Sequence, residues 1–483
     1  MSKSRFFKLP LILFIFSVLN ITNIGAQPLD TAPNKEWIKI YYEANGLNRI
    51  NMHLVSDVDS IFYTREAVVP SGEPQTLLNI RSAGSELFTL PIDSIQTMKL
   101  DSNLPTLYIT TDPYVDEIVN KEEYLDATLR YVPYGDNTEP FEQAVNIKGR
   151  GNSSWAFPKK PYRLKFDKKQ EFANLKKAKS FVLLSNYIDN TLMRNAVAFK
   201  IAQLLNMPYT GKLVPVNLIF NGMERGNYML TNKIGINSGS VDIDEEEGIL
   251  WELGVEMDEE FCFRTPTFNV PCMVKDPDFN EIANGNSSQI AETWNYWQAD
   301  MESAMKAVNE GRWQEVFDAD QFVKYFVIND IVLNTELEFP KSFYLYKESK
   351  DGKYKLGPVW DFDWSFGYHH DINRGVIYRG CGSFDFLSKI FDDSKFLEMF
   401  EIEFNEFCDN HLDELMNFID DYALLIRDSA LRDAMLWPQE HYNERYEHEE
   451  RHAARFDRNV ENLKDWIHRR IAVIKSKPNF ALY

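Results

Sequence analysis

The feature that most constrains this chain is the run from Gly357 to Gly367, in which two carboxylates, Asp361 and Asp363, stand among aromatic and small residues. In an extended segment, alternation would place both acids on one face and the aromatic rings on the other. Like charges about 6–7 Å apart beside apolar rings are costly unless a cation lies between them. The run therefore predicts a magnesium site made of carboxylate oxygens. The alternative is a solvated turn in which the aspartates cap backbone N–H groups.

The N-terminus has the pattern of a secretory signal peptide over residues 1–26. Three cations, Lys3, Arg5 and Lys8, precede the apolar stretch 9–19, and small residues at positions 25 and 26 offer a cleavage site. No later stretch approaches the ~20 apolar residues that a membrane span needs. We therefore expect a secreted, periplasmic or cell-surface protein with no membrane span after cleavage, and a retained N-terminal anchor is the alternative.

Composition narrows the class of partner. The formal net charge is −21, which makes the chain a poor non-specific partner for nucleic acid or an anionic membrane. We expect no nucleic-acid partner, and an extracytoplasmic protein as substrate or surface partner. The four cysteines are Cys262, Cys272, Cys381 and Cys408. The first two could close a small loop in an oxidising compartment, or all four could be free and buried.

The chain is long enough for two domains. Residues 27–103 contain short β-type runs at 38–42, 61–63 and 87–90, which predict a small β-rich accessory module. A linker near residues 101–105 leads into a main domain over residues 104–483.

In the main domain, β-type runs come first and helical patterns come later, which predicts an α+β fold. Strands are expected at 107–111, 125–132, 162–166 and 249–253, and the Asn221-Gly222 pair predicts a hairpin between 214 and 230. Helices are expected at 192–205, 290–309, 319–333 and 454–475, the first with Asp189 or Asn190 as its N-cap. The Pro- and Asn-rich stretch 265–286 has the composition of an irregular insertion.

Cations near a glycine-flanked loop form a second candidate group. Arg150 lies between Gly149 and Gly151, and Arg163 and Lys165 share the cationic face of the strand that follows. Backbone N–H groups and neighbouring cations of this kind can bind nucleotide phosphates. The loop lacks P-loop spacing, and a tight hairpin with solvated cations is the alternative.

Polar residues at the end of the 319–333 helix form a third group. Here Glu336 could act as a general base, and the amide oxygen of Asn334 could bind a metal ion. Residues in this position are otherwise helix-cap and loop residues.

Several of these segments together resemble the CotH family of spore-coat protein H-like, secreted, atypical kinase-like proteins. They are 147–154, 159–165, 183–195, 226–230 and, above all, 357–363, and they follow one another in the family's order. The resemblance implies a protein-kinase-like fold with a strand-rich N-terminal part and a helical C-terminal part. It also implies transfer of phosphate from ATP, with Mg²⁺, to serine or threonine side chains of secreted proteins.

Carried over by position, the resemblance places the family's lysine-bearing strand on Arg163 and Lys165, and its metal-binding motif on Asp361 with Asp363. The family's Asn-x-Asp, whose Asp is the presumed catalytic residue, corresponds to Asn334-Thr335-Glu336. Glu336 extends the carboxylate by one methylene, and a ~1 Å displacement can cost on the order of 100-fold in rate. Two hypotheses follow: an active kinase with Glu336 and Asp361 as catalytic residues, or a catalytically degenerate scaffold or binding protein of the cell surface.

Overall fold

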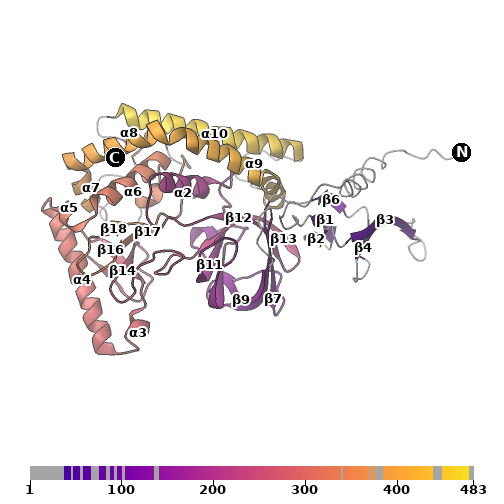
Figure 1. Ribbon diagram of the computed structural model, residues 1–483, viewed down its shortest axis with the longest axis horizontal. Helices are drawn as coiled ribbons and strands as arrows, with labels where there is room; N and C mark the ends of the chain where they lie inside the picture. Colours follow the sequence, from indigo (N-terminus) through magenta and orange to yellow (C-terminus); the bar gives the residue numbers. More distant parts are fainter. Residues whose placement is uncertain are drawn as a thin grey trace, which may run out of the picture.

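The computed structural model describes residues 37–44, 47–54, 58–66, 75–82, 88–91, 95–100, 104–134, 141–338, 341–368, 371–375, 385–438 and 449–477. The predicted signal peptide lies outside these residues. Within them the protein is an α+β protein, strand-rich in its N-terminal half and helical towards its C-terminus (Figure 1).

The larger sheet closes on itself through seven strands. These follow the order β11-β10-β9-β8-β7-β12-β13, and β11 also pairs with β13. Only β7 and β12 are parallel among the described pairs in this ring. The strands are β7 (Thr106–Asp112), β8 (Leu125–Val132), β9 (Phe141–Gly149), β10 (Tyr162–Gln170), β11 (Ala178–Leu184), β12 (Val214–Phe220) and β13 (Met223–Asn232). Buried residues from alternate positions fill the interior, among them Leu107, Leu129, Leu164, Phe181 and Leu218.

Six of the described strands lie within residues 27–103, the predicted accessory module. β1 (Trp37–Ala44), β2 (Leu47–Leu54) and β6 (Ile95–Leu100) extend the large sheet, and β2 meets β13 at the pair Arg49 and Met223. β3 (Val58–Glu66), β4 (Gln75–Ser82) and β5 (Phe88–Pro91) form a separate sheet. The β-type runs expected at 38–42 and 61–63 thus occur within β1 and β3, and residues 88–90 of the third run lie in β5, while residue 87 lies outside the described residues. The domain boundary itself stays a prediction.

The second half combines a smaller sheet with helices. The sheet has the order β15-β16-β14-β17-β18, and helices α8, α9 and α10 lie together along one side of the molecule (Figure 1). The strands are β14 (Ile249–Leu253), β15 (Cys262–Arg264), β16 (Pro271–Asp276), β17 (Phe343–Lys347) and β18 (Lys355–Leu356). The helices are α2 (Arg194–Leu204), α3 (Phe279–Ile282), α4 (Ser287–Asn309), α5 (Trp313–Val316), α6 (Ala319–Val332), α7 (Asp385–Phe391), α8 (Ser394–Asn410), α9 (Leu412–Leu436) and α10 (Glu449–Ser476). One apolar core joins them, with α6 buried along most of its length.

The local predictions hold where the sequence pattern is strong. β12 and β13 form the expected hairpin, and Asn221 and Gly222 take the positive φ values of 48° and 73° that a type I′ turn needs. The predicted N-cap of α2 at Asp189 or Asn190 is wrong, because the helix begins at Arg194 and its N-cap is Met193, which makes no side-chain capping hydrogen bond. Asp189 still accepts a hydrogen bond from the backbone N–H of Arg194 at 2.8 Å.

Two expectations are wrong in part. The stretch 265–286 contains β16 and α3, because the apolar residues from Cys272 to Val274 pair with β14 and are buried despite their polar flanks. Residues 357–362 are not a strand, and Asp361 has a φ of 62°. Contacts from distant elements, described below, hold this bend in place of a ladder.

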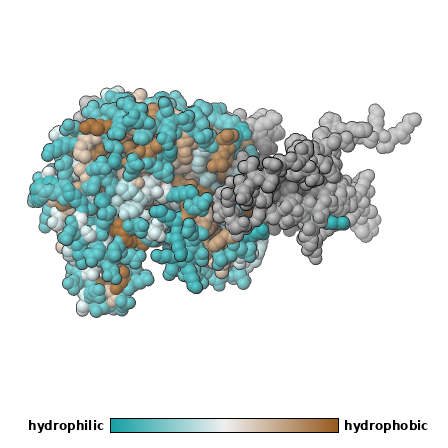
Figure 2. Space-filling view, viewed as in Figure 1, coloured by the Kyte–Doolittle hydropathy of each residue, from teal (hydrophilic) through white to brown (hydrophobic). Residues whose placement is uncertain are grey.

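Surface and thiol features complete the fold. The face seen in Figure 2 is mostly hydrophilic over the described part. Among the described helices, none has both the length and the apolar composition that crossing a bilayer requires. Cys262, Cys272 and Cys408 are free thiols, and Cys381 lies outside the described residues.

A buried ion pair ties the large sheet to α9. The Lys159 side chain is fully buried and its Nζ lies 2.6 Å from Oδ1 of Asp433. The same oxygen accepts a hydrogen bond from the Asn227 N–H at 2.8 Å. Gly226 has a φ of +82°, and a Cβ there would lie 2.2 Å from the Asp433 carboxylate. The pair therefore requires glycine at position 226.

We expect Lys159→Met to lower the free energy of unfolding by about 3–5 kcal/mol, because it leaves the Asp433 carboxylate buried without its partner. Lys464→Met is the matched control, since Lys464 joins α10 to Asp420 of α9 at 2.8 Å in a more exposed pair, worth under about 1 kcal/mol. Chemical denaturation of both variants measures the difference. Equal losses of unfolding free energy in the two variants would show that the buried Lys159–Asp433 pair stabilises the fold no more than the exposed pair does.

Candidate functional site

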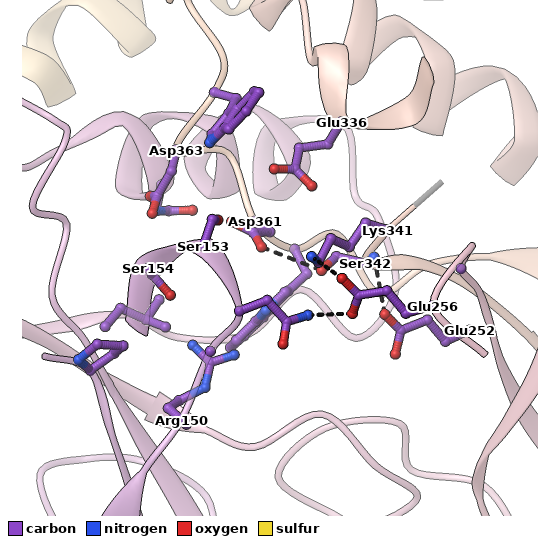
Figure 3. A pocket seen from close by; sticks show the side chains of 18 of the residues that line it. Arg150, Ser153, Ser154, Glu252, Glu256, Glu336, Lys341, Ser342, Asp361 and Asp363 are labelled. Carbon is purple, nitrogen blue, oxygen red and sulfur yellow. Dashed lines mark hydrogen bonds and ion pairs between the residues drawn. The ribbon is translucent and has the colours of Figure 1, made fainter. Parts of the chain in front are cut away.

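A cavity of about 210 Å³ collects the predicted acidic residues. Figure 3 shows Glu336, Asp361 and Asp363 converging on it from the loop after α6 and from the run after β18. We call it the carboxylate pocket. Its other walls come from the 150–154 loop, the N-terminal end of α2, the segment 252–258 and the start of β17.

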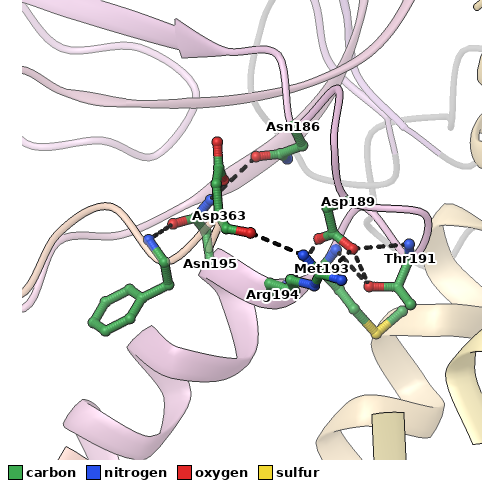
Figure 4. A network of polar contacts seen from close by, with 8 residues as sticks. Asn186, Asp189, Thr191, Met193, Arg194, Asn195 and Asp363 are labelled. Carbon is green, nitrogen blue, oxygen red and sulfur yellow. Dashed lines mark hydrogen bonds and ion pairs between the residues drawn. The ribbon is translucent and has the colours of Figure 1, made fainter. Parts of the chain in front are cut away.

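The N-terminal end of α2 fixes the bend of the Asp-containing run (Figure 4). The Asn195 side chain donates to Oδ1 of Asp363 at 2.6 Å and accepts from the N–H of Phe362 at 2.9 Å. The Arg194 guanidinium donates to the backbone oxygen of Asp363 at 2.8 Å. These contacts hold the Asp363 carboxylate in the pocket and account for the positive φ at Asp361.

Burial raises the pKa of all three carboxylates, and the charge of Asp361 adds to the rise at the other two. Removal from water, followed by the charge of Asp361, raises the pKa of Glu336 to about 8. The same two causes raise the pKa of Asp363 to about 7. Removal from water also raises the pKa of Asp361, while the Arg150 guanidinium opposes the rise. The pocket therefore holds more negative charge than its surroundings compensate.

Most nearby cations are already paired. Lys341 lies 2.7 Å from Glu256, and Lys275 lies 2.9 Å from Glu252. By contrast, the Glu336 carboxylate accepts no hydrogen bond from the described residues, and Asp361 accepts one, from the Ser342 hydroxyl at 3.4 Å. These two acids keep oxygen lone pairs available for a ligand.

The predicted phosphate-binding cations are distributed unequally. Arg150 lines the carboxylate pocket and also a second, adjoining cavity. Arg163 lines only the second cavity of the two. Lys165 is exposed, lies 5.8 Å from the Tyr124 ring centroid and lines neither of these two cavities.

The structure places Asn334 behind the pocket. Its side chain is buried, donates to Asn329 at 3.0 Å and accepts from the backbone N–H of Glu336 at 3.2 Å. It thus shapes the loop that presents Glu336, and it does not line the carboxylate pocket.

Sequence reasoning did not single out Asn195, Ser342 or Lys233 for the site. Asn195 lies in a family-like segment that offered a signal, whereas Lys233 is brought close only by the fold. The sequence also holds a His-Glu-x-x-His pattern from His448 to His452, a spacing at which two helix-borne imidazoles can share a zinc ion. Side chains of this stretch lie outside the described residues, so the pattern stays a sequence observation.

The donor set fits a magnesium ion that is shared with phosphate. Among the described residues, no three His, Cys, Asp or Glu side chains are grouped so as to hold a metal ion alone. Magnesium usually takes one or two protein carboxylates and completes its shell with water and substrate phosphates. Asp361 and Asp363 supply carboxylates of this type, while part of the Asp363 carboxylate is engaged by Asn195.

Comparison with known proteins agrees with the sequence resemblance. No curated protein matches the chain. Residues 147–474, which include the glycine-flanked loop, the carboxylate pocket and most of α10, match the family described as CotH kinase protein. This match covers most of the chain, so the protein belongs to the CotH kinase protein family.

Proposed function

We propose that this protein is a secreted, CotH-like atypical kinase with a kinase-like fold, which transfers phosphate from ATP, with Mg²⁺, to serine or threonine side chains of an extracytoplasmic protein. The observation that carries the proposal is the convergence of Glu336, Asp361 and Asp363 in one pocket with raised pKa values. Carboxylates with this excess of charge are suited to a divalent cation. Family membership supplies the reaction class.

Each acid has a proposed role. Asp361 and Asp363 hold the metal ion, and Asn195 orients the second of them. When bound, Mg²⁺ neutralises phosphate charge and ATP supplies the phosphoryl group. Glu336 accepts the proton of the acceptor hydroxyl, because its carboxylate is not otherwise hydrogen-bonded within the described residues. Asn334 was predicted as a further metal ligand, and its contacts favour a role in positioning Glu336.

The cations would bind the phosphates. Arg150 lies at the boundary of the two cavities, where it can approach a phosphate held near Asp361. Arg163 would act from the second cavity. Lys165, the third predicted nucleotide-binding residue, is exposed and lines neither cavity, so it is not part of the proposed phosphate site.

A degenerate scaffold is the second candidate, and the identity of residue 336 favours it. Glutamate stands where the family resemblance places an aspartate, so the carboxylate reaches further. In such a protein the pocket would still bind Mg²⁺ and nucleotide, and the surface would bind a partner without phosphate transfer. The two candidates differ in turnover and agree in binding.

We expect ATP with Mg²⁺ to raise the melting temperature of the wild type, and Asp361→Asn and Asp363→Asn to lose most of this rise. Without ligand, both variants should be at least as stable as the wild type, because each removes one of several repelling charges. Asp351→Asn, in an exposed turn, is the control and should respond like the wild type. Identical titrations for all variants would rule out this nucleotide site.

The ligand-free protein should lose stability as the pH rises from about 4 to about 8. The unfolded carboxyl groups ionise near pH 4, whereas those of Asp363 and Glu336 retain protons in the folded state up to about 7 and 8. Below about pH 4 both states are protonated and the penalty is absent. The free energy of unfolding of Glu336→Gln should therefore increase relative to that of the wild type as the pH rises, by about 1–2 kcal/mol after allowing for solvent screening.

Thermal unfolding of both proteins at about pH 5 and about pH 9 measures this gain. Glu292→Gln, at an exposed position of α4, is the control and should follow the wild type at both pH values. Parallel curves for Glu336→Gln and the wild type would mean that Glu336 does not bear the excess charge.

Phosphate transfer can be followed by mass spectrometry of the purified protein incubated with ATP and Mg²⁺. We expect Glu336→Gln to lower incorporation about 100-fold or more while leaving the thermal shift with ATP in place, because a general base contributes about 10²–10⁴ to the rate. A silent wild type beside an active Glu336→Asp would instead identify the degenerate scaffold.

A further inference from the structure

The second cavity is cationic, in contrast to the carboxylate pocket. It encloses about 250 Å³ between the large sheet and the smaller sheet. Six of its lining side chains are cationic and one, Glu122, is acidic. The cations are Lys121, Lys148, Arg150, Arg163, Lys233 and Lys275. They come from β9, β10, β16, the end of β13 and two loops, so the fold and not the local sequence brings them together.

Half of these cations already have partners. Lys275 lies 2.6 Å from Glu259 and also contacts Glu252. Lys121 donates to the backbone oxygen of Gly151 at 3.0 Å, and Lys148 donates to that of Glu122 at 3.4 Å. These three side chains build the wall of the cavity, with much of their hydrogen-bonding capacity committed to protein atoms.

The other three cations lack such partners. Within the described residues, the side chains of Arg150, Arg163 and Lys233 form no hydrogen bond and no ion pair with an acid. The Nε of Arg163 is buried without a hydrogen-bond acceptor, and its guanidinium lies 5.9 Å from the Tyr124 ring centroid. A buried guanidinium donor without an acceptor costs free energy unless a ligand provides one.

Repulsion among the cations of this cavity contributes to the lowered pKa values of two of its lysines. Removal from water, followed by the charges of Arg163 and Lys275, lowers the pKa of Lys233 to about 8. Removal from water and Arg163 also lower the pKa of Lys148. An anion in the cavity would relieve this repulsion and restore full charge to both lysines.

We propose that this cationic cavity binds a phosphate group through Lys233, Arg163 and Arg150, independently of the metal ion. Two arginines and a lysine that form no ion pair with an acid of the described residues favour a compact anion of more than one charge over a single carboxylate. Lys233 is the new element, since neither its position in the sequence nor the family resemblance assigned it. The proposal rests on the proposed function for phosphate chemistry at this end of the pocket, and it does not require Asp361 or Mg²⁺.

The phosphate has two possible sources with the same chemistry. Because Arg150, Tyr344 and Trp360 line both cavities, phosphates of a nucleotide could extend from one cavity into the other. A phosphate of another molecule, such as a free phosphate, could instead occupy the cationic cavity alone. Comparing pyrophosphate with ATP distinguishes these sources.

The test measures binding of pyrophosphate to the full chain in EDTA, by calorimetry and by thermal shift, against sodium chloride of equal ionic strength. We expect Lys233→Met and Arg163→Met each to weaken pyrophosphate binding about tenfold or more, which is about 1.4 kcal/mol per tenfold. Lys233→Met should still fold, because it removes a repelled charge. Lys165→Met is the matched control: it removes a cation from the same face of β10 as Arg163, but one that lines neither cavity.

Each outcome decides the proposal. Weaker pyrophosphate binding in Lys233→Met and Arg163→Met, with unchanged binding in Lys165→Met, supports the proposal. If the same two variants also lose ATP binding in EDTA, the cavity binds the phosphates of the nucleotide itself. Unchanged ATP binding assigns it to another phosphate. Equal binding in all variants, or equal loss in Lys165→Met, overturns it. Retention of pyrophosphate binding in Asp361→Asn separates this result from a failure of the metal site.

Discussion

The arrangement of the site depends on three carboxylates that are held close together against their own repulsion. Asp361 and Asp363 are two residues apart, and Glu336 reaches them from a separate loop. Left to themselves, these side chains would turn towards solvent. The Asn195 amide prevents this for Asp363 by holding both its carboxylate and the backbone of Phe362. Contacts from α2 therefore offset the unfavourable free energy of this repulsion, and Asp189 in turn holds the first turn of α2 in place.

Buried polar pairs set the position of the helices around this site. Lys159, which follows the glycine-flanked loop, is tied to Asp433 of α9. Arg470 of α10 forms a fully buried pair with Asp330 of α6 and donates to backbone oxygens of Ile372 and Arg374. The second pair lies just before the loop that carries Glu336. Such pairs tolerate few alternative geometries, because any shift leaves a charge buried without its partner. The two buried pairs are therefore suited to holding the walls of the pocket at fixed positions relative to each other.

Sequence patterns predicted the elements whose signals are local. The Asn221-Gly222 turn, the alternation of β10 and the apolar periodicity of α10 were each visible within about 20 residues. Asp361, Asp363, Glu336 and Arg150 line one pocket, and their roles there stay predictions. The positions of Lys165 and Lys233 were beyond such reasoning. Which cation faces a cavity depends on how the closed sheet sits against the smaller one, and that packing has no local sequence signature.

The separation of charge between the two cavities constrains what can bind there. Six cations line the second cavity, Glu336, Asp361 and Asp363 line the carboxylate pocket, and Arg150, Lys275, Tyr344 and Trp360 line both. If the two sets were free to meet, they would pair and cancel. Lys275 does pair with Glu252, but within the described residues Arg150, Arg163 and Lys233 form no ion pair with Glu336, Asp361 or Asp363, so each cavity keeps charge without an ion-pair partner. A ligand that carries anionic groups together with a divalent cation satisfies both cavities at once, whereas a neutral or purely cationic ligand satisfies neither.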